Sequence, residues 1–264
     1  MLRVVDEWLK LVRQVGYAID VHTHIGADDA FNQALIGLFK RLNIGLAYTS
    51  YYPYDMSSMR PPSDELWRLN NVVLQYQRRY RWIIGFVHVN PLNPDAAKMA
   101  EYFLREGMRG IKLYRAVKVT HPSVKPILEL AVSFDVPVLV HTAHRLYPRG
   151  RPNESDSADV AKAASRYPRL KLIMAHIGGG GDWEYGVLAI RETPNVYPDI
   201  GGSVADAGMV EYAVRVLGPD RVLFGTDNLV WAAVGRLIDA ELSIDDKAKI
   251  IRYNAERIGL GEGQ

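Results

Sequence analysis

The sequence contains no cysteine. This excludes a disulfide framework, a cysteine-based zinc site and a thiol nucleophile, so any chemistry must use side chains such as His, Asp, Glu, Lys, Ser or Tyr. An excess of one charge is also missing, because 32 Lys and Arg stand against 30 Asp and Glu, a formal net charge of +2. That balance provides no strongly basic surface, so we expect no nucleic-acid partner.

Long apolar runs are absent too. No run approaches the roughly 18 consecutive apolar residues that a membrane helix needs. The first residues, MLRVVDEWLKLVRQVG, form an amphipathic stretch interrupted by charges, which is not the apolar core of a signal peptide. We therefore expect a cytoplasmic protein without a membrane partner.

Short apolar runs are what the chain does contain, and stretches with helical spacing separate them. Eight such runs cover residues 18–24, 44–51, 82–90, 109–114, 136–143, 170–177, 195–201 and 221–227. Runs rich in Val, Ile and Leu that alternate with helices are typical of a parallel sheet covered by helices. Eight βα units in 264 residues predict an α/β fold, a (β/α)8 TIM barrel made by a single domain, residues 1–264.

The structural alternative is a doubly wound open sheet. That fold normally has a Gly-rich phosphate turn after its first strand, whereas this chain reads HTHIGADD there. Residues 1–17 predict an extra N-terminal helix that closes the bottom of the barrel, and residues 231–241 and 243–259 predict two final helices.

Two histidines stand at the end of the first run. His22 and His24 are two residues apart, so both should face the barrel interior, while Val21 and Thr23 face the helices. Asp20 lies one step deeper on the interior face, where we expect it to orient a ligand histidine.

Three later runs end in the same way. His141 closes the fifth run, His176 the sixth and Asp227 the eighth. Barrel active sites lie at the C-terminal ends of the strands, and scattered core histidines would have no reason to prefer these positions. Imidazole nitrogens suit first-row metals, so the five residues together predict a site for a divalent metal ion.

Longer strings around these residues carry a family resemblance. In chain order, GFVHVNP, GMRGIKLY, VPVLVHTA, LIMAHIGG, NVYPDIGG, VLFGTDN and YNAERIGL, together with the HxH on the first strand, resemble the amidohydrolase superfamily. Within it they are similar to the amidohydrolase-related branch that contains aminocarboxymuconate-semialdehyde decarboxylase, aromatic-acid decarboxylases and some lactonases.

The resemblance implies a ligand set. One divalent metal, with Zn²⁺ the first choice and Mn²⁺ the second, would be held by His22, His24, His141 and Asp227. His176 would serve as general acid and base, and Asp227 could also take a proton from water. Family members are often dimers, so the resemblance allows a homodimer.

Lys112 bears on the number of metals. It alternates with Ile111 and Leu113, which places its amine inside the barrel. In other branches of the superfamily a strand-four lysine is carbamylated and bridges two metals, so a second ion is expected only if Lys112 is carbamylated. TatD-like nucleases, a competing family, have Glu where this chain has Lys112 and ETD where it has GTD.

Candidate substrate-binding residues follow the strands. Arg115 and Arg145 come after the fourth and fifth runs, where a guanidinium can bind a carboxylate through two hydrogen bonds. Lys112 is a further candidate, as is His88, which should face inward from the third run. These side chains predict a small, carboxylated substrate.

Hydrolysis is the first choice of reaction because it covers most of the superfamily. A divalent metal would then activate a water molecule for attack on the substrate. The alternative is non-oxidative, metal-dependent decarboxylation within the same branch. A metal-binding scaffold without catalysis is less favoured, since a decayed site usually loses a motif residue, and all five are present here.

Overall fold

The computed structural model describes residues 2–51, 59–144 and 152–261. The strands are β1 (Ala18–Ile25), β2 (Ile44–Tyr51), β3 (Ile83–Gly85), β4 (Val87–Val89), β5 (Ile111–Leu113), β6 (Val138–Val140), β7 (Leu172–Met174) and β8 (Val196–Pro198). The α-helices before the last strand are α1 (Leu2–Val15), α2 (Asp29–Arg41), α3 (Ser63–Arg79), α4 (Ala96–Arg105), α5 (Lys125–Ser133), α6 (Ser157–Arg166) and α7 (Trp183–Ala189). Those after it are α8 (Met209–Leu217), α9 (Val230–Asp239), α10 (Ile244–Ala248) and α11 (Asn254–Arg257). Short turns of tighter or wider helix are η1 (Pro122–Val124), η3 (Ala175–Gly178) and η4 (Lys249–Tyr253).

All strand pairs are parallel, in the orders β1-β2-β3 and β4-β5-β6-β7-β8. β3 and β4 together make the third predicted strand, which is interrupted at Phe86. The Phe86 amide donates to the Thr49 carbonyl of β2, and the Val87 amide donates to the Gly110 carbonyl beside β5. The interrupted strand therefore connects the two sheets.

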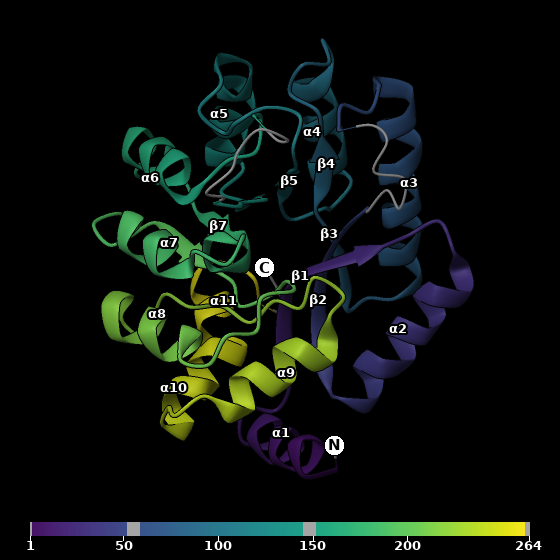
Figure 1. The fold of residues 1–264 in the computed structure, drawn as a ribbon. Coiled ribbons are helices and arrows are strands. Elements are labelled where there is room, and N and C mark those ends of the chain that lie inside the picture. Colours follow the sequence, from purple (N-terminus) through teal and green to yellow (C-terminus); the bar gives the residue numbers. More distant parts are fainter. Residues whose placement is uncertain (1, 52–58, 145–151, 262–264) are drawn as a thin grey trace.

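The eighth predicted strand connects the other two edges. The Ile200 amide donates to the Leu223 carbonyl, and the Val21 amide of β1 donates to the Phe224 carbonyl. Residues 221–224 thus lie between β8 and β1 as a bridging segment shorter than the predicted run. This circuit of hydrogen bonds, with the helices outside it, is the predicted α/β barrel (Figure 1).

The barrel interior has an apolar half, which we call the interior cluster. It consists of buried side chains from the strands and from the C-terminal segment: Ile19, Val21, Leu46, Tyr48, Phe86, Leu139, Ile173, Ala175, Leu223, Ala255, Ile258 and Leu260. No described side chain of α1 belongs to it, since Trp8, Leu11 and Val12 pack instead in the cluster that includes α9 and α10. Most of the closure that the sequence assigned to residues 1–17 is therefore made by residues 255–260. Of the described part of that stretch, Tyr17, which follows α1, packs against the cluster.

Val21 also departs from the prediction, because it faces the interior cluster and not the helices. The pairing register between β1 and β2 shifts between Asp20 and Thr23. Such an irregularity breaks the simple alternation of side chains. Val21 and His22 can then both contribute to the barrel interior.

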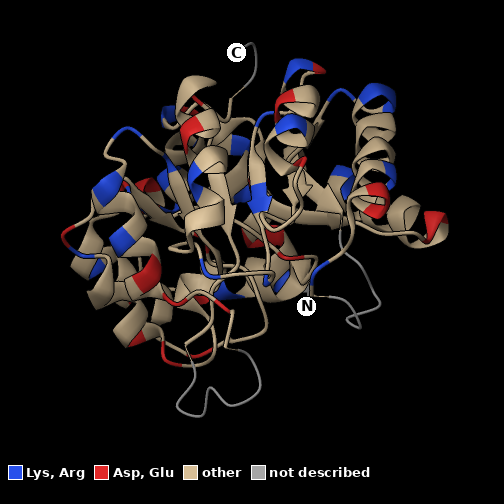
Figure 2. Ribbon diagram, turned by 90° about the horizontal axis from the view of Figure 1, so that it is seen from above, with Lys and Arg blue, Asp and Glu red and all other residues tan. Residues whose placement is uncertain are grey.

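Charged residues cover the outside of the helices. Lys and Arg are interspersed with Asp and Glu in the view from above (Figure 2). Among the described helices, none has the length and the apolar character needed to cross a membrane.

We predict that Leu260→Ala lowers the free energy of unfolding by about 2–5 kcal/mol, because it leaves a cavity in the interior cluster. Leu260 is fully buried there. Urea unfolding followed by circular dichroism measures the change. Leu188→Ala is the matched control, since Leu188 is 49% exposed on α7 and its loss should cost about 0.5 kcal/mol or less. Equal effects of the two variants would contradict the closure by residues 255–260.

Candidate metal centre

The first strand presents His22 with both ring nitrogens engaged. Its Nδ1 lies 2.9 Å from Asp199 Oδ2 and its Nε2 lies 3.0 Å from Lys112 Nζ. Lysine has donors but no acceptor when it is protonated, so Nε2 accepts and Nδ1–H donates to Asp199. This tautomer directs the lone pair of Nε2 toward the centre of the site.

His24 faces the same centre. Its Nδ1 lies 3.1 Å from Ser50 Oγ and its Nε2 lies 2.9 Å from Asp227 Oδ1. His22 Nε2 is 3.5 Å from the same Asp227 oxygen. One ligand atom from each of His22, His24 and Asp227 can be chosen so that all three lie within 4.8 Å of one another. Two imidazole nitrogens and a carboxylate oxygen fit a divalent metal ion.

The turn that holds Asp227 is fixed against β1. The Asp227 amide donates to the His22 carbonyl at 2.6 Å, and the Asn228 side chain both donates to the His24 carbonyl and accepts from the His24 amide. Asp227 has a φ of 51°. Gly225 permits the close approach, because a Cβ there would stand 2.9 Å from the Cβ of His22.

His176 follows β7 within the η3 turn. Its ring centre is 5.0 Å from that of His22, and its Nε2 lies 3.8 Å from Asp227 Oδ2. The predicted acid and base therefore borders the two carboxylates and one imidazole of the centre. The structure brings His22, His24, His176 and Asp227 together, as the sequence predicts.

Asp199 is a site residue that sequence reasoning missed. It is fully buried, and besides its contact with His22 its Oδ1 accepts from the backbone amides of His176 and Gly201. It has the orienting role that we predicted for Asp20. Asp20 instead accepts from the backbone of His22 and Thr226 and from the Thr226 hydroxyl, so it joins two backbones. Asp199 closes the seventh apolar run, so the rule that found the other site residues could have found it.

His141 lies beside the centre, with its ring centre 5.3 Å from that of His176. It is not in either potential metal-binding group formed by the described residues. Its Nε2 is 2.8 Å from Glu154 Oε1, and Arg115 Nε is 2.8 Å from the same oxygen. Glu154, which sequence reasoning also missed, thus contacts both a predicted ligand and a predicted substrate residue. Glu154 lies in a loop, where no helical or strand periodicity of apolar residues could have indicated its position.

The remaining substrate candidates have different positions. Lys112 faces the interior beside His22, and Ile111 and Leu113 face the helices, as predicted. His88 is buried with its ring centre 6.0 Å from that of Tyr114, and its Nδ1 has no hydrogen-bond partner among the described residues. Arg145 lies outside the described residues.

Burial keeps the imidazoles of the site neutral. It lowers the pKa of His22 and His24, and it lowers the pKa of His176 to about 4. Burial alone would raise the pKa of Asp227, but its electrostatic interactions with His22 and His176 and its hydrogen bond with His24 lower the pKa below its usual range. Neutral imidazoles and an ionised carboxylate are the protonation states that bind a metal ion.

Burial also lowers the pKa of Lys112 to about 8, although the charges of Asp227 and Asp199 oppose that change. A cavity of about 140 Å³ opens next to the centre. Its lining includes Arg115, His141, His176 and Asp227. The site is therefore reached from the C-terminal ends of the strands, as in other barrels.

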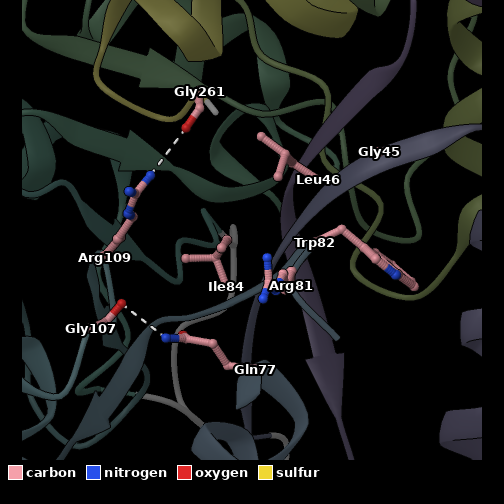
Figure 3. Close-up of a pocket in the computed structure, with 9 residues that line it drawn as sticks. All are labelled: Gly45, Leu46, Gln77, Arg81, Trp82, Ile84, Gly107, Arg109 and Gly261. Carbon is pink, nitrogen blue, oxygen red and sulfur yellow. Dashed lines mark hydrogen bonds between the residues drawn. The ribbon is translucent and has the colours of Figure 1, made fainter. Parts of the chain in front are cut away.

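A larger cavity of about 520 Å³ lies elsewhere, at the N-terminal ends of β2 and β3 (Figure 3). Its wall carries Arg81 and Arg109, and Arg109 donates to the Gly261 carbonyl. Neither an imidazole nor a carboxylate side chain is among the described residues that line it. The smaller cavity is therefore the one associated with the candidate chemistry.

We predict that Asp199→Asn weakens the binding of a divalent metal by about 10- to 100-fold, because the His22 ring loses the carboxylate that orients it. A competition titration with a chromophoric chelator measures the affinity for Mn²⁺ and Zn²⁺. Asp206→Asn makes the same change of charge at an exposed residue whose carboxylate accepts from Trp183 Nε1, and it should leave the affinity unchanged. An Asp199→Asn protein with normal affinity would contradict the orienting role.

Comparison with solved structures shows the same fold in several enzymes. The chain is 16% identical to 2,6-dihydroxybenzoate decarboxylase from Rhizobium, with a TM-score of 0.70 over 92% of this chain and 98% of that one. It is 17% identical to 5-carboxyvanillate decarboxylase from Novosphingobium aromaticivorans, solved with manganese and 4-hydroxy-3-methoxy-5-nitrobenzoic acid, with a TM-score of 0.71 over 92% and 96% of the chains. For 4-oxalomesaconate hydratase from Rhodopseudomonas palustris the identity is 16% and the TM-score 0.65 over 91% and 95%.

No curated protein sequence matches the chain. The family model described as amidohydrolase, however, matches residues 67–258, which include β3 to β8, His88, Lys112, His141, His176, Asp199 and Asp227. This match covers well over half of the chain and agrees with the resemblance seen in the motifs. The protein belongs to the amidohydrolase family.

Proposed function

We propose that the protein is a metal-dependent, non-oxidative decarboxylase that acts on a small carboxylic acid. The observation that carries this proposal is the pair of cationic side chains beside the His and Asp centre. Lys112 is buried against His22, and Arg115 lines the cavity together with His176 and Asp227. Charges interact more strongly in such a poorly hydrated site than in water, and a carboxylate is a fitting partner for Lys112. Arg115 already contacts Glu154 through Nε, but its buried Nη1 has no hydrogen-bond partner among the described residues and can still bind a substrate carboxylate.

The comparisons favour decarboxylation over the hydrolysis that the sequence suggested first. Two of the similar structures are decarboxylases of aromatic acids, and one was solved with manganese. That metal supports Mn²⁺ as the ion to test first, with Zn²⁺ as the alternative. The similar hydratase is a reminder that one fold carries several reactions, so the assignment depends on the site.

His22, His24 and Asp227 would hold the ion in the arrangement described above. When bound there, a divalent ion supplies a positive charge that polarises an oxygen of the substrate. We propose His141 as a further ligand, as the family resemblance implies. Its Nε2 is engaged by Glu154, which leaves Nδ1 as its other donor atom.

Decarboxylation breaks the bond between the carboxyl carbon and the substrate. The electron pair stays on the substrate carbon, CO₂ leaves, and the substrate carbon takes up a proton. We assign the delivery of this proton to His176 at Nε2, because the ring borders the cavity and Asp227. Because burial keeps the free ring neutral, the imidazole acts as a relay: it takes the proton from solvent and passes it to the substrate carbon. Lys112 and Arg115 would hold the anionic substrate in place during these steps.

Hydrolysis is the second candidate, favoured by Asp227 and His176 lying at the same cavity, where either could take a proton from water. A second metal ion is expected only if Lys112 is carbamylated. Elemental analysis of the purified protein would measure the number of metal ions per chain. The balanced surface charge supports a small-molecule substrate over nucleic acid. For the assembly, we propose to test first the homodimer that the family resemblance allows.

We predict that metal-loaded protein releases CO₂ from one or more members of a panel of aromatic and unsaturated carboxylic acids, and that a chelator abolishes the release. His176→Ala should lower kcat by about 10²- to 10⁴-fold and retain the metal, since the ring acts on the proton. His121→Ala, at an exposed histidine after β5, is the control and should behave as wild type. Metal-dependent turnover only of esters, lactones or amides in the same assay would replace decarboxylation with hydrolysis.

A further inference from the structure

His176 has an unusual backbone for a residue that carries a side chain. Its φ and ψ are 64° and 26°, and those of Ile177 are 49° and 39°. Both residues therefore lie in the left-handed region, which residues other than glycine seldom adopt. Backbone strain of this kind persists only where the surrounding structure stabilises it. Asp199 holds it here, because its side chain accepts from the His176 amide and its carbonyl accepts from the Ile177 amide.

The imidazole of His176 is fixed in a different way. Its buried Nδ1 has no hydrogen-bond partner among the described residues. Instead, the inner edge of the ring packs against Gly202. A Cβ built on Gly202 would stand 2.6 Å from His176 Nδ1 and 2.9 Å from its Cγ, distances too short for atoms in contact. These atoms are at the root of the ring, so they cannot move aside without displacing the whole imidazole.

Gly202 belongs to a loop after β8 that is held from two sides. Arg236 of α9 donates to the carbonyls of Ile200, Gly202 and Val204. The Gly201 amide donates to Asp199 at 2.8 Å. Gly202 itself has a φ of 82°, which an L side chain rarely adopts. The position of this loop is therefore well defined by polar contacts, although Gly202 provides no side chain.

We propose that Gly202, held in place by Arg236, is a positioning residue that sets the orientation of the His176 ring. The inference rests on the proposed role of His176 in proton transfer. The backbone of Gly202 supports one edge of the ring, and Nε2 on the far side is directed to the cavity and to Asp227. Neither Gly202 nor Arg236 is a proposed metal ligand. Substitution of either residue should therefore affect the proton transfer and leave the metal site intact.

The test compares Gly202→Ala with Gly208→Ala in metal-loaded protein. Gly208 has a φ of 83°, almost the same as Gly202, but a Cβ there would meet nothing within 4 Å. Both variants carry the same backbone strain, and only the first displaces His176. Gly202→Ala should lower kcat by at least about 10-fold, since a displacement of 1 Å can cost about 10²-fold. The KM and the metal content should change little, and Gly208→Ala should keep the kcat of wild type.

A second readout does not depend on the reaction. Long-range ¹H–¹⁵N spectra of the zinc-loaded protein report the ring nitrogens of His176, and their shifts should change in Gly202→Ala but not in Gly208→Ala. Arg236→Lys should change them in the same direction by a smaller amount, and it serves as the test if Gly202→Ala does not fold. Identical His176 signals in wild type, Gly202→Ala and Arg236→Lys would overturn the proposal, whatever reaction the enzyme catalyses.

A double-mutant cycle separates positioning from a general structural effect. If Gly202 acts through His176, Gly202→Ala should cause no further loss of kcat in a His176→Ala background. An equal loss in both backgrounds would show that Gly202 acts independently of His176 and would refute the inference. Absence of any decarboxylation would refute the proposed function but would leave the spectroscopic comparison decisive for Gly202.

Discussion

The carboxylate of Asp199 is the group on which the candidate site depends. It accepts from the ring of His22 and from the backbone amides of His176 and Gly201, and so connects the ends of the first, sixth and seventh predicted strands. Burial alone would raise its pKa, but the electrostatic interaction and the hydrogen bond with the His22 ring lower the pKa below the usual range. Asp199 is therefore ionised, and one charged group aligns a metal ligand with the proposed proton donor.

The barrel interior has an apolar end that stabilises the fold and a polar end that carries the candidate site. At one end, the interior cluster is apolar and buried, and it includes Phe86, Leu139 and Ile173. At the other, Arg115, His141, His176 and Asp227 line a small cavity, and Lys112 lies nearby against His22. Buried polar groups are costly unless they are paired. His22, Lys112 and Asp199 are paired here, whereas Nδ1 of His88 and of His176 has no hydrogen-bond partner among the described residues. The polar half can therefore persist because the apolar half stabilises the barrel below it.

Much of this arrangement could be predicted from the sequence, where regular alternation held. Lys112 faces inward from β5 as its neighbours imply, and His176 and Asp227 meet His22 because strand ends converge at one face of a barrel. Val21 could not be placed, since the register shift in β1 leaves no mark in the residue pattern. The left-handed backbone of His176 was equally hidden, because contacts with Asp199 impose it and local preference opposes it. Glu154 reaches His141 from a loop, whose path no periodicity describes.

The closure of the interior cluster by residues 255–260 links the order of synthesis to the order of folding. Leu260 and Ile258 pack in the same cluster as Ile19 and Val21, which the ribosome adds near the start of the chain. The contacts of the first strand with residues 255–260 can therefore form only after nearly all of the described chain has been made, although its contacts with Leu46 and Tyr48 can form earlier. Contacts so distant in sequence slow the final step of folding, and the nascent barrel exposes its interior to aggregation and to chaperones during that interval.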